Sequence, residues 1–138
     1  MLYIENNSNC TIDENFLNKI CNTLTKKDVE LLIVDDRYMK ELNLAQRGKD
    51  ESTDVLSFPL EEIEHSPLGS IVINIQKAEE ISSKFGHSTE NEIALLFIHG
   101  LLHLLGYDHE KDNGEMRQKE VKIIKEFNLP TSLIVRVS

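Results

Sequence analysis

The sequence predicts a layered α/β or α+β domain, built from helices that alternate with about four strands. Two observations predict this class of fold. Segments with apolar residues at helical spacing alternate with short runs rich in β-branched residues, which is typical of a sheet covered by helices. The longest apolar stretch, residues 93–105, indicates a central buried helix. The chain has 138 residues, the size of one domain, so we expect a single domain over residues 1–138.

The N-terminal part predicts a strand followed by an amphipathic helix. Residues 2–5 are expected to form the short strand. Thr11 and Glu14 have the spacing of a capping box, in which each side chain bonds a backbone N–H at the start of a helix. The apolar residues that follow at helical spacing are Phe16, Leu17, Ile20, Cys21 and Leu24.

Two more strands and a second helix are expected before the middle of the chain. Residues 29–34 are nearly all apolar and indicate a buried strand. Asp35 or Asp36 is placed to cap the helix that follows. Residues 54–59 alternate between polar and apolar side chains and end in proline, which indicates a strand. Residues 61–67 are expected to form a charged connection.

The second half predicts a further strand and the remaining helices. Residues 69–73 are the strand, and Asn74 is placed to cap the helix after it. Thr89 and Glu92 have capping-box spacing just before the apolar helix.

The C-terminal region predicts a last helix and a short final element. Asp112 or Asn113 is placed to start the helix. Residues 133–137 indicate a short strand or an ordered tail.

Charge and composition exclude several classes of protein. A formal net charge of −9 argues against a broad basic face for nucleic acid, so any RNA contact must be local. The longest apolar stretch is too short to span a bilayer, and no basic segment precedes an apolar run at the N-terminus, so we expect neither a membrane contact nor a secretory signal. Cys10 and Cys21 lack metal-ligand spacing and indicate buried thiols in a reducing cytoplasm. No nucleotide cofactor is expected.

Three histidines within eleven residues are the strongest functional signal in the chain. His99 and His103 are four residues apart, which stacks their rings on one face of a helix. Gly106 follows where a helix commonly ends in a left-handed turn, and the chain can reverse there to return His109 as a third ligand. The spacing is that of the HExxHxxGxxH zinc motif.

Three neutral imidazoles leave the fourth position of a tetrahedral zinc site open, as in catalytic sites. One zinc ion is expected, although three nitrogen ligands also suit nickel, copper or iron. Gly100 stands where zinc proteases carry their general base, Glu. This glycine either opens space beside the metal for a phosphodiester or allows close packing of the helix on the sheet. His65 and His87 lie in polar segments and are expected to face solvent.

The region from the second helix to the third histidine resembles the YbeY family of bacterial endoribonucleases. The segment His-Gly-x-Leu-His-Leu-x-Gly-Tyr-Asp-His is the hallmark of that family, and residues 99–109 match each fixed position. A second characteristic block comprises Leu42-Asn43, Arg47-Gly48-Lys49-Asp50 and residues 53–59. One position departs from the family, because Ser70 stands where its members usually have Asp.

The resemblance implies a zincin-like fold, with a small, mostly parallel four-stranded sheet packed around the metal-bearing helix. It implies that His99, His103 and His109 bind zinc and that Arg47 lies over the metal cleft. The implied activity is metal-dependent, single-strand-directed RNA cleavage. It would act in maturation of the 3′ end of small-subunit (16S) rRNA and in ribosome quality control, with a small-subunit particle as partner.

The chemistry expected from these residues is attack of zinc-activated water on phosphorus, with Arg47 as a bidentate clamp on the phosphate. Attack by the 2′-hydroxyl of the RNA is an alternative. Asp108 is either a catalytic residue, as a proton acceptor or the partner of an imidazole, or a turn residue past the helix. Two other functions stay open: metal-dependent hydrolysis of a peptide or small molecule, and a ribosome-assembly binding protein whose metal holds the fold.

Overall fold

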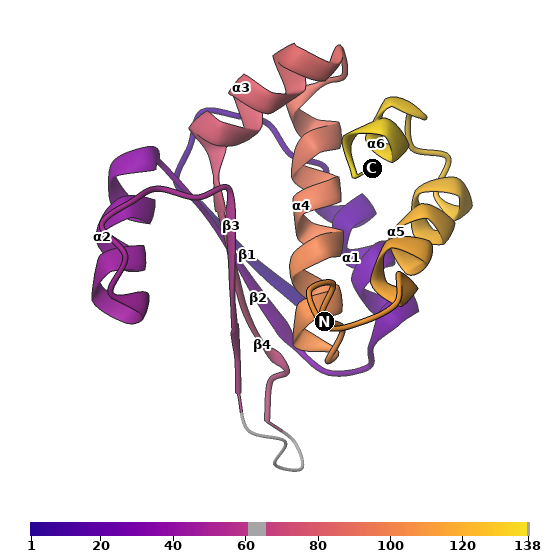
Figure 1. Cartoon of the computed structure of the whole chain (residues 1–138), viewed down its shortest axis with the longest axis horizontal. Helices are drawn as coiled ribbons and strands as arrows, with labels where there is room; N and C mark the ends of the chain where they lie inside the picture. The colour runs from indigo at the N-terminus through magenta and orange to yellow at the C-terminus, as the bar shows by residue number, and fades with distance from the viewer. Residues whose placement is uncertain (61–65, 138) are drawn as a thin grey trace.

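Helices cover both faces of one sheet in the computed structural model, which describes residues 1–60 and 66–137 (Figure 1). This α+β architecture agrees with the predicted class of fold. The elements in chain order are β1 (Leu2–Asn6), α1 (Glu14–Leu24), β2 (Val29–Val34), α2 (Asp36–Arg47), β3 (Val55–Pro59), β4 (Gly69–Asn74), α3 (Ile75–Phe85), α4 (Thr89–Leu104), α5 (Glu115–Glu126) and α6 (Ser132–Arg136). His65 and most of the predicted connection over residues 61–67 lie outside the described residues.

The sheet has four strands among the described residues, in the order β1-β2-β4-β3. β1, β2 and β4 run parallel, whereas β3 pairs antiparallel with β4 at one edge. The sheet is therefore mixed and mostly parallel, as predicted. β2 and β4 occupy the centre, which explains their mostly apolar sequences, because strands covered on both faces are largely hydrophobic.

The two faces of the sheet pack against different helices. Ile71 and Ile73 of β4 belong to the main core with α4, while Val72 between them joins a smaller core with Met39 of α2. Figure 1 shows α2 on one side of the sheet, with α4, α1 and α5 on the other. α4 is thus enclosed by the sheet and by helices, which explains why it is apolar nearly all round.

The caps of two helices differ from the prediction. α1 begins at Glu14 and is capped by Asp13, whose Oδ1 accepts a first-turn backbone N–H at 3.1 Å, so Thr11 is not the cap. α4 is capped by Ser88, one residue before the predicted position. The capping box fails there because the Glu92 carboxylate is buried and bound by other side chains. Asp35 and Asn74 cap α2 and α3 as predicted.

The C-terminal elements also differ in part. α5 begins at Glu115, later than predicted. Asp112 lies before the helix, and its carboxylate accepts the backbone N–H groups of Gly114 and Met116. α6 forms where a short strand or tail was predicted. Leu133 packs with α4 and α5 there instead of joining the sheet. The prediction is wrong because an apolar run this short is compatible with either a helix or a strand.

Both cysteines are free thiols, and the prediction that they are buried is confirmed for Cys21 alone. Cys21 is buried and Cys10 half-buried, and burial raises the pKa of each thiol. No helix in the described part of the chain is both long and apolar enough to cross a membrane.

Candidate metal centre

The end of α4 and the turn after it bring the three histidines together. Gly106 has a φ of 99°, a left-handed conformation that glycine adopts at little cost. The N–H groups of Gly106 and Tyr107 bond back to the carbonyls of His103 and Leu102, each at 3.0 Å. This pair of bonds is the Schellman motif, which reverses the chain and returns His109 to the helix as predicted.

The three histidines form a cluster in which one ring nitrogen from each lies within 4.8 Å of the others. His99 Nε2 and His103 Nε2 are 3.2 Å apart, and the ring centroid of His109 is 5.4 Å from each of the other two. The cluster contains no carboxylate or thiol from the described residues. These residues can therefore hold a metal ion and leave a coordination position open.

Hydrogen bonds determine which nitrogens face the centre of the cluster. His99 Nδ1 donates to Glu120 Oε1 at 2.9 Å, and His103 Nδ1 donates to the Tyr107 carbonyl at 3.0 Å. Because these acceptors take the Nδ1 protons, each Nε2 of a neutral ring carries a lone pair. Tetrahedral zinc, with Zn–N bonds of about 2.0–2.1 Å, would separate two nitrogens by about 3.3 Å, close to the distance between the two Nε2 atoms.

The electrostatics of the cluster also fit a dication. Burial, and then the neighbouring His99, lower the pKa of His103 below its usual value, which favours the neutral imidazole that binds metal. Glu120 is 4% exposed, and its Oε2 has no hydrogen-bond partner among the described residues. The cost of burying the negative charge of Glu120 is offset when His99, to which it is hydrogen-bonded, binds a dication.

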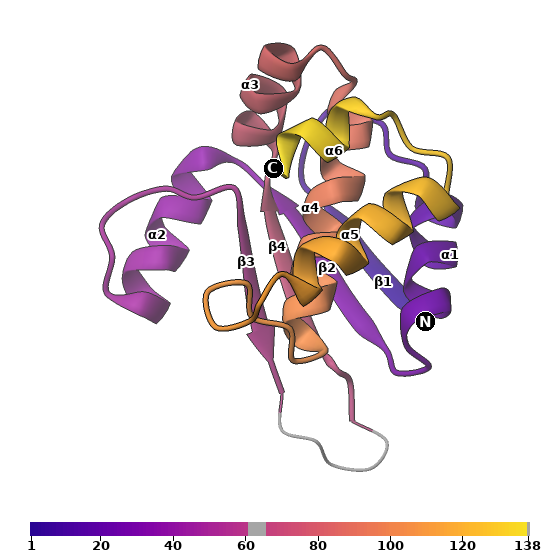
Figure 2. The ribbon, with the colours of Figure 1, turned by 45° about the vertical axis from the view of Figure 1, so that its right-hand side comes forward.

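A cavity of about 500 Å³ opens beside the histidines. It lies between β3, α4, α5 and α6, and Figure 2 shows α5 and α6 crossing in front of α4. His99 and His109 line it, together with two arginines, Arg117 and Arg136, that the sequence did not single out. The cavity therefore borders two of the three histidines of the cluster.

A buried network joins α6 to this cavity and contradicts one prediction. The His87 side chain is 1% exposed instead of facing solvent, with Nε2 2.8 Å from Glu92 Oε1 and Nδ1 2.9 Å from Ser132 Oγ. Glu92 Oε2 accepts from Arg136 Nε at 3.3 Å, and Arg136 Nη2 donates to Asp54 Oδ2 at 3.2 Å. His87 is buried because its partners on α4 and α6 satisfy both ring nitrogens.

Arg47 lies away from the cavity. It is exposed in the last turn of α2, which packs on the sheet face opposite α4, and it is not among the described residues that line the cavity. The loop after it is anchored, because Asn43 Nδ2 donates to the Glu51 carbonyl at 2.8 Å. That loop leads to Asp54 in the cavity wall.

Asp108 serves the turn between the helix and His109. Its Oδ1 accepts the Glu110 N–H at 3.0 Å, as turn aspartates commonly do. Its charge raises the pKa of His103 against the stronger effect of burial. Asp108 therefore makes the contact of a turn residue, and its catalytic role stays a prediction.

Gly100 packs α4 closely against the sheet. A Cβ at this position would lie 2.8 Å from Ile71 Cγ2 and 3.1 Å from Ser57 Oγ. Ser57 Oγ also donates to the Gly100 carbonyl at 3.0 Å. The packing alternative is confirmed. Ser70, which departs from the family pattern, donates to Glu30 Oε2 at 3.1 Å on the α2 face of the sheet, away from the histidines.

An α+β fold with three converging histidines and an open side is typical of metal-dependent hydrolases. A family model described as Endoribonuclease YbeY matches residues 4–128. The chain belongs to the YbeY endoribonuclease family.

Relatives named Endoribonuclease YbeY match nearly the whole chain. One from Nautilia profundicola is 60% identical over 136 residues, covering 99% of this chain and 98% of that protein. One from Helicobacter pylori strain P12 is 59% identical over 137 residues, with the same coverage. One from Campylobacter jejuni strain RM1221 is 62% identical over 122 residues, covering 88% and 90%. The fold is also similar to the solution structure of a Thermotoga maritima protein, with a TM-score of 0.64, 32% identity and coverage of 92% and 89%.

Proposed function

We propose that the protein is a zinc-dependent, single-strand-directed endoribonuclease formed by a single domain over residues 1–138. The observation that carries this proposal is the pair of Nε2 atoms of His99 and His103, 3.2 Å apart beside an open cavity, with their Nδ1 protons held by Glu120 and Tyr107. RNA as the substrate is supported by the chain's family, whose matching relatives are named endoribonucleases.

His99, His103 and His109 would hold the zinc ion in a zincin-like arrangement. When bound, zinc supplies Lewis acidity, which lowers the pKa of water and polarises a phosphoryl oxygen. The residues of the chain orient the imidazoles. Glu120 does this for His99, the Tyr107 carbonyl does it for His103, and Asp108 holds the turn that presents His109.

Cleavage of RNA agrees with the site better than cleavage of peptides. Gly100 stands where zinc proteases carry their base, and it packs against the sheet. The nucleophile is either water or the 2′-hydroxyl of the RNA, and the products separate the two. Attack by the 2′-hydroxyl leaves a 2′,3′-cyclic phosphate, whereas attack by water does not.

Arg47 is proposed to bind a phosphate of the RNA strand at the point where the RNA leaves the cavity and passes over β3, at the edge of the sheet. Its planar guanidinium matches two phosphate oxygens. The anchored loop between Arg47 and Asp54 links this position to the cavity wall. Because the net charge of the chain is −9, a small-subunit particle is proposed to supply most of the docking surface. The substrate would be the 3′ end of precursor 16S rRNA in the cytoplasm, where free cysteines persist.

Cleavage assays with measured metal content test the proposal. Single-stranded and fully paired RNA are offered to wild type, His103→Ala and Arg47→Ala, with and without chelator. Arg37→Ala is the matched control, since Arg37 is an exposed arginine on the same helix. We expect chelation and His103→Ala to abolish cleavage, and Arg47→Ala to slow it about tenfold or more with metal content unchanged.

Two results would contradict the proposal. Cleavage that persists equally in all conditions points to a contaminating nuclease. Unfolding on metal removal, with no metal-dependent cleavage by the folded protein, identifies the metal as structural.

A further inference from the structure

The cavity beside the histidines has a second polar feature, the ion pair of Asp54 and Arg136. Arg136 Nη2 donates to Asp54 Oδ2 at 3.2 Å, and both side chains line the cavity, where Asp54 is 29% and Arg136 22% exposed. The apolar part of the lining consists of Val55, Leu95, Leu96 and Val137. An apolar lining with a few fixed polar groups is typical of sites for small organic groups, and the volume of about 500 Å³ lies in their range.

Contacts on both sides fix the orientation of this pair. Arg136 Nε donates to Glu92 Oε2 at 3.3 Å, and the Glu92 side chain is fully buried on α4, where its other oxygen is 2.8 Å from His87 Nε2. The Asp54 carbonyl accepts the Asn74 N–H at 2.9 Å, which ties the residue before β3 to the end of β4. Because the pair is already held in place, a ligand that binds it costs the protein little conformational freedom.

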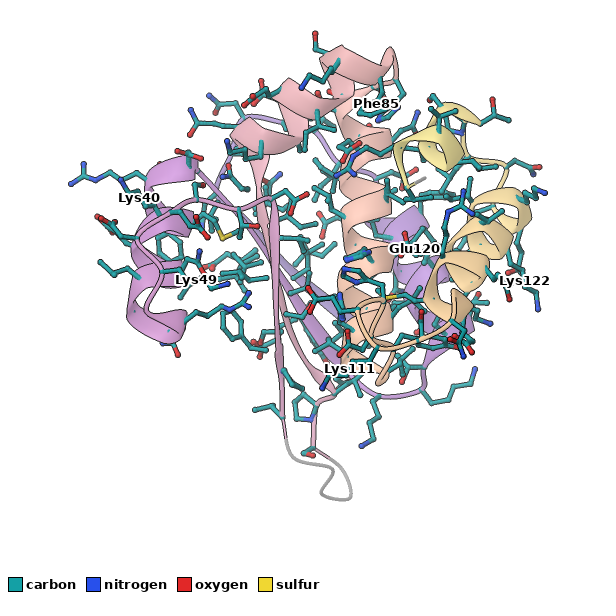
Figure 3. All side chains as sticks on the ribbon, viewed as in Figure 1. Lys40, Lys49, Phe85, Lys111, Glu120 and Lys122 are labelled. Carbon is teal, nitrogen blue, oxygen red and sulfur yellow. The ribbon has the colours of Figure 1, made fainter. Side chains whose placement is uncertain are left out.

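The pair lies along α4 from the metal centre. Glu92, which binds Arg136, precedes His99 by seven residues, so the two lie on one side of α4, about 10 Å apart along its axis. The metal end of the cavity lies at Glu120, which holds His99. Figure 3 shows Glu120 pointing from α5 toward α4, whereas Lys122 on the same helix points outward. A nucleotide next to a phosphodiester at the histidines can therefore reach the pair.

The chemistry of the pair suits a hydroxyl. A carboxylate can accept about four hydrogen bonds. Among the residues that the structure describes, Asp54 accepts from Arg136 Nη2 and, at 3.4 Å, from Thr53 Oγ1, so it keeps capacity for a ligand. Asp54 and Glu92 balance the positive charge of Arg136, so the pair does not attract a further anion. A neutral group that donates a hydrogen bond to the carboxylate meets no such repulsion.

We propose that Asp54 accepts a hydrogen bond from the 2′-hydroxyl of a ribose next to the cleaved phosphodiester, and that this contact selects RNA over DNA. This inference rests on the proposed function. The 2′-hydroxyl is the group by which a protein distinguishes RNA from DNA at a given site. When DNA occupies the cavity, the Asp54 carboxylate is left without this donor in a partly apolar wall, which weakens binding. Arg136 is the positioning residue that holds the carboxylate toward the ribose.

Binding of three oligonucleotides to the metal-loaded protein tests the inference. The probes are a short single-stranded RNA, the same sequence with fluorine in place of each 2′-hydroxyl, and the corresponding DNA. A 2′-fluoro sugar keeps the conformation of ribose but has no proton to donate, so it isolates the hydrogen bond. Kd is measured before turnover, and cleavage of the RNA is followed separately.

Two variants remove the acceptor or its charge, and a third is the matched control. Asp54→Ala removes the acceptor, and Asp54→Asn keeps an oxygen that can also accept from Arg136, so the test stands if Asp54→Ala is unstable. Glu51→Ala is the control, because Glu51 is an exposed residue in the loop that leads to Asp54. Metal content and thermal unfolding of each variant establish that the histidine site and the fold are intact.

Wild type is expected to bind the RNA about tenfold more tightly than the 2′-fluoro RNA or the DNA. Asp54→Ala should bring this ratio of Kd values close to unity, Asp54→Asn should lie between, and Glu51→Ala should match wild type. The ratio removes general effects, because an arginine released by Asp54→Ala would change the binding of all three probes alike. RNAs with a single 2′-fluorine should place the effect at one ribose.

The outcomes separate the inference from the proposed function. Cleavage of RNA by wild type, with a ratio that is unchanged in Asp54→Ala and Asp54→Asn, overturns the inference alone. Equal binding of RNA and 2′-fluoro RNA by wild type, or an equal effect of Glu51→Ala, does the same. An Asp54-dependent preference for RNA without metal-dependent cleavage supports the inference and overturns the nuclease proposal. Absence of both binding and cleavage in wild type overturns both.

Discussion

Glu120→Ala is expected to weaken zinc binding about 10–100-fold, which corresponds to about 1.4–2.7 kcal/mol. Glu120 Oε1 accepts the Nδ1 proton of His99 at 2.9 Å, and the Glu120 side chain is 5% exposed, so water does not readily replace this bond. Without the acceptor, the His99 ring loses both its orientation and part of its basicity as a ligand. Glu120→Gln keeps an acceptor oxygen without the charge and should lie between Glu120→Ala and wild type.

Competition with a chromophoric chelator at neutral pH measures this effect. Glu126→Gln is the matched control, because Glu126 is exposed on the same helix. Thermal unfolding of the metal-free proteins, measured in parallel, separates a folding defect from a loss of affinity. Equal zinc affinity in Glu120→Ala and Glu126→Gln would refute the role assigned to Glu120.

Three further predictions concern stability. Gly100→Ala is expected to destabilise the fold by about 1–2 kcal/mol in denaturant titrations, because its Cβ would lie 2.8 Å from Ile71 Cγ2. His87→Ala should cost about 2–3 kcal/mol in the same assay, since it leaves buried Glu92 without one of its partners. Hydrogen bonds from Ser52 and then Asn74 lower the pKa of Asp36 below 3.8. The stability that these hydrogen bonds contribute is present above the ordinary pKa of the carboxyl, 3.8, and is lost as the pH falls through its lowered pKa in the folded protein. Acid titration of unfolding should therefore show a smaller loss in Asp36→Asn than in wild type.

Each of these predictions has a result that would contradict it. Gly100→Ala as stable as wild type would mean that α4 shifts freely on the sheet. A neutral His87→Ala would mean that the network does not hold α6. An acid profile of Asp36→Asn that overlays that of wild type would remove Asp36 from the groups that stabilise the loop after α2.

The histidine cluster could be predicted from sequence because its geometry is local. A four-residue step and a glycine turn place all three rings within one helix end. The central strands and α4 were likewise predictable, because burial on every side leaves a continuous apolar pattern.

The cavity wall and the buried network could not be predicted in this way. His87 meets Ser132 across 45 residues, and Arg136 meets Asp54 across 82, so no local pattern marks these pairs. His87 lies in a polar segment, which favours exposure until α6 packs over it. Arg117 resembles any solvated residue of α5 until the packing of α5 places it in the cavity wall. The position of α6 follows from packing of Leu133, which a five-residue segment does not reveal.

X-ray absorption at the zinc edge of the metal-loaded protein tests the open three-histidine centre most directly. The expected spectrum fits three imidazole nitrogens and one oxygen from solvent, each at about 2.0–2.1 Å. A sulfur scatterer, a fourth imidazole or fewer than three imidazoles would contradict the assigned site.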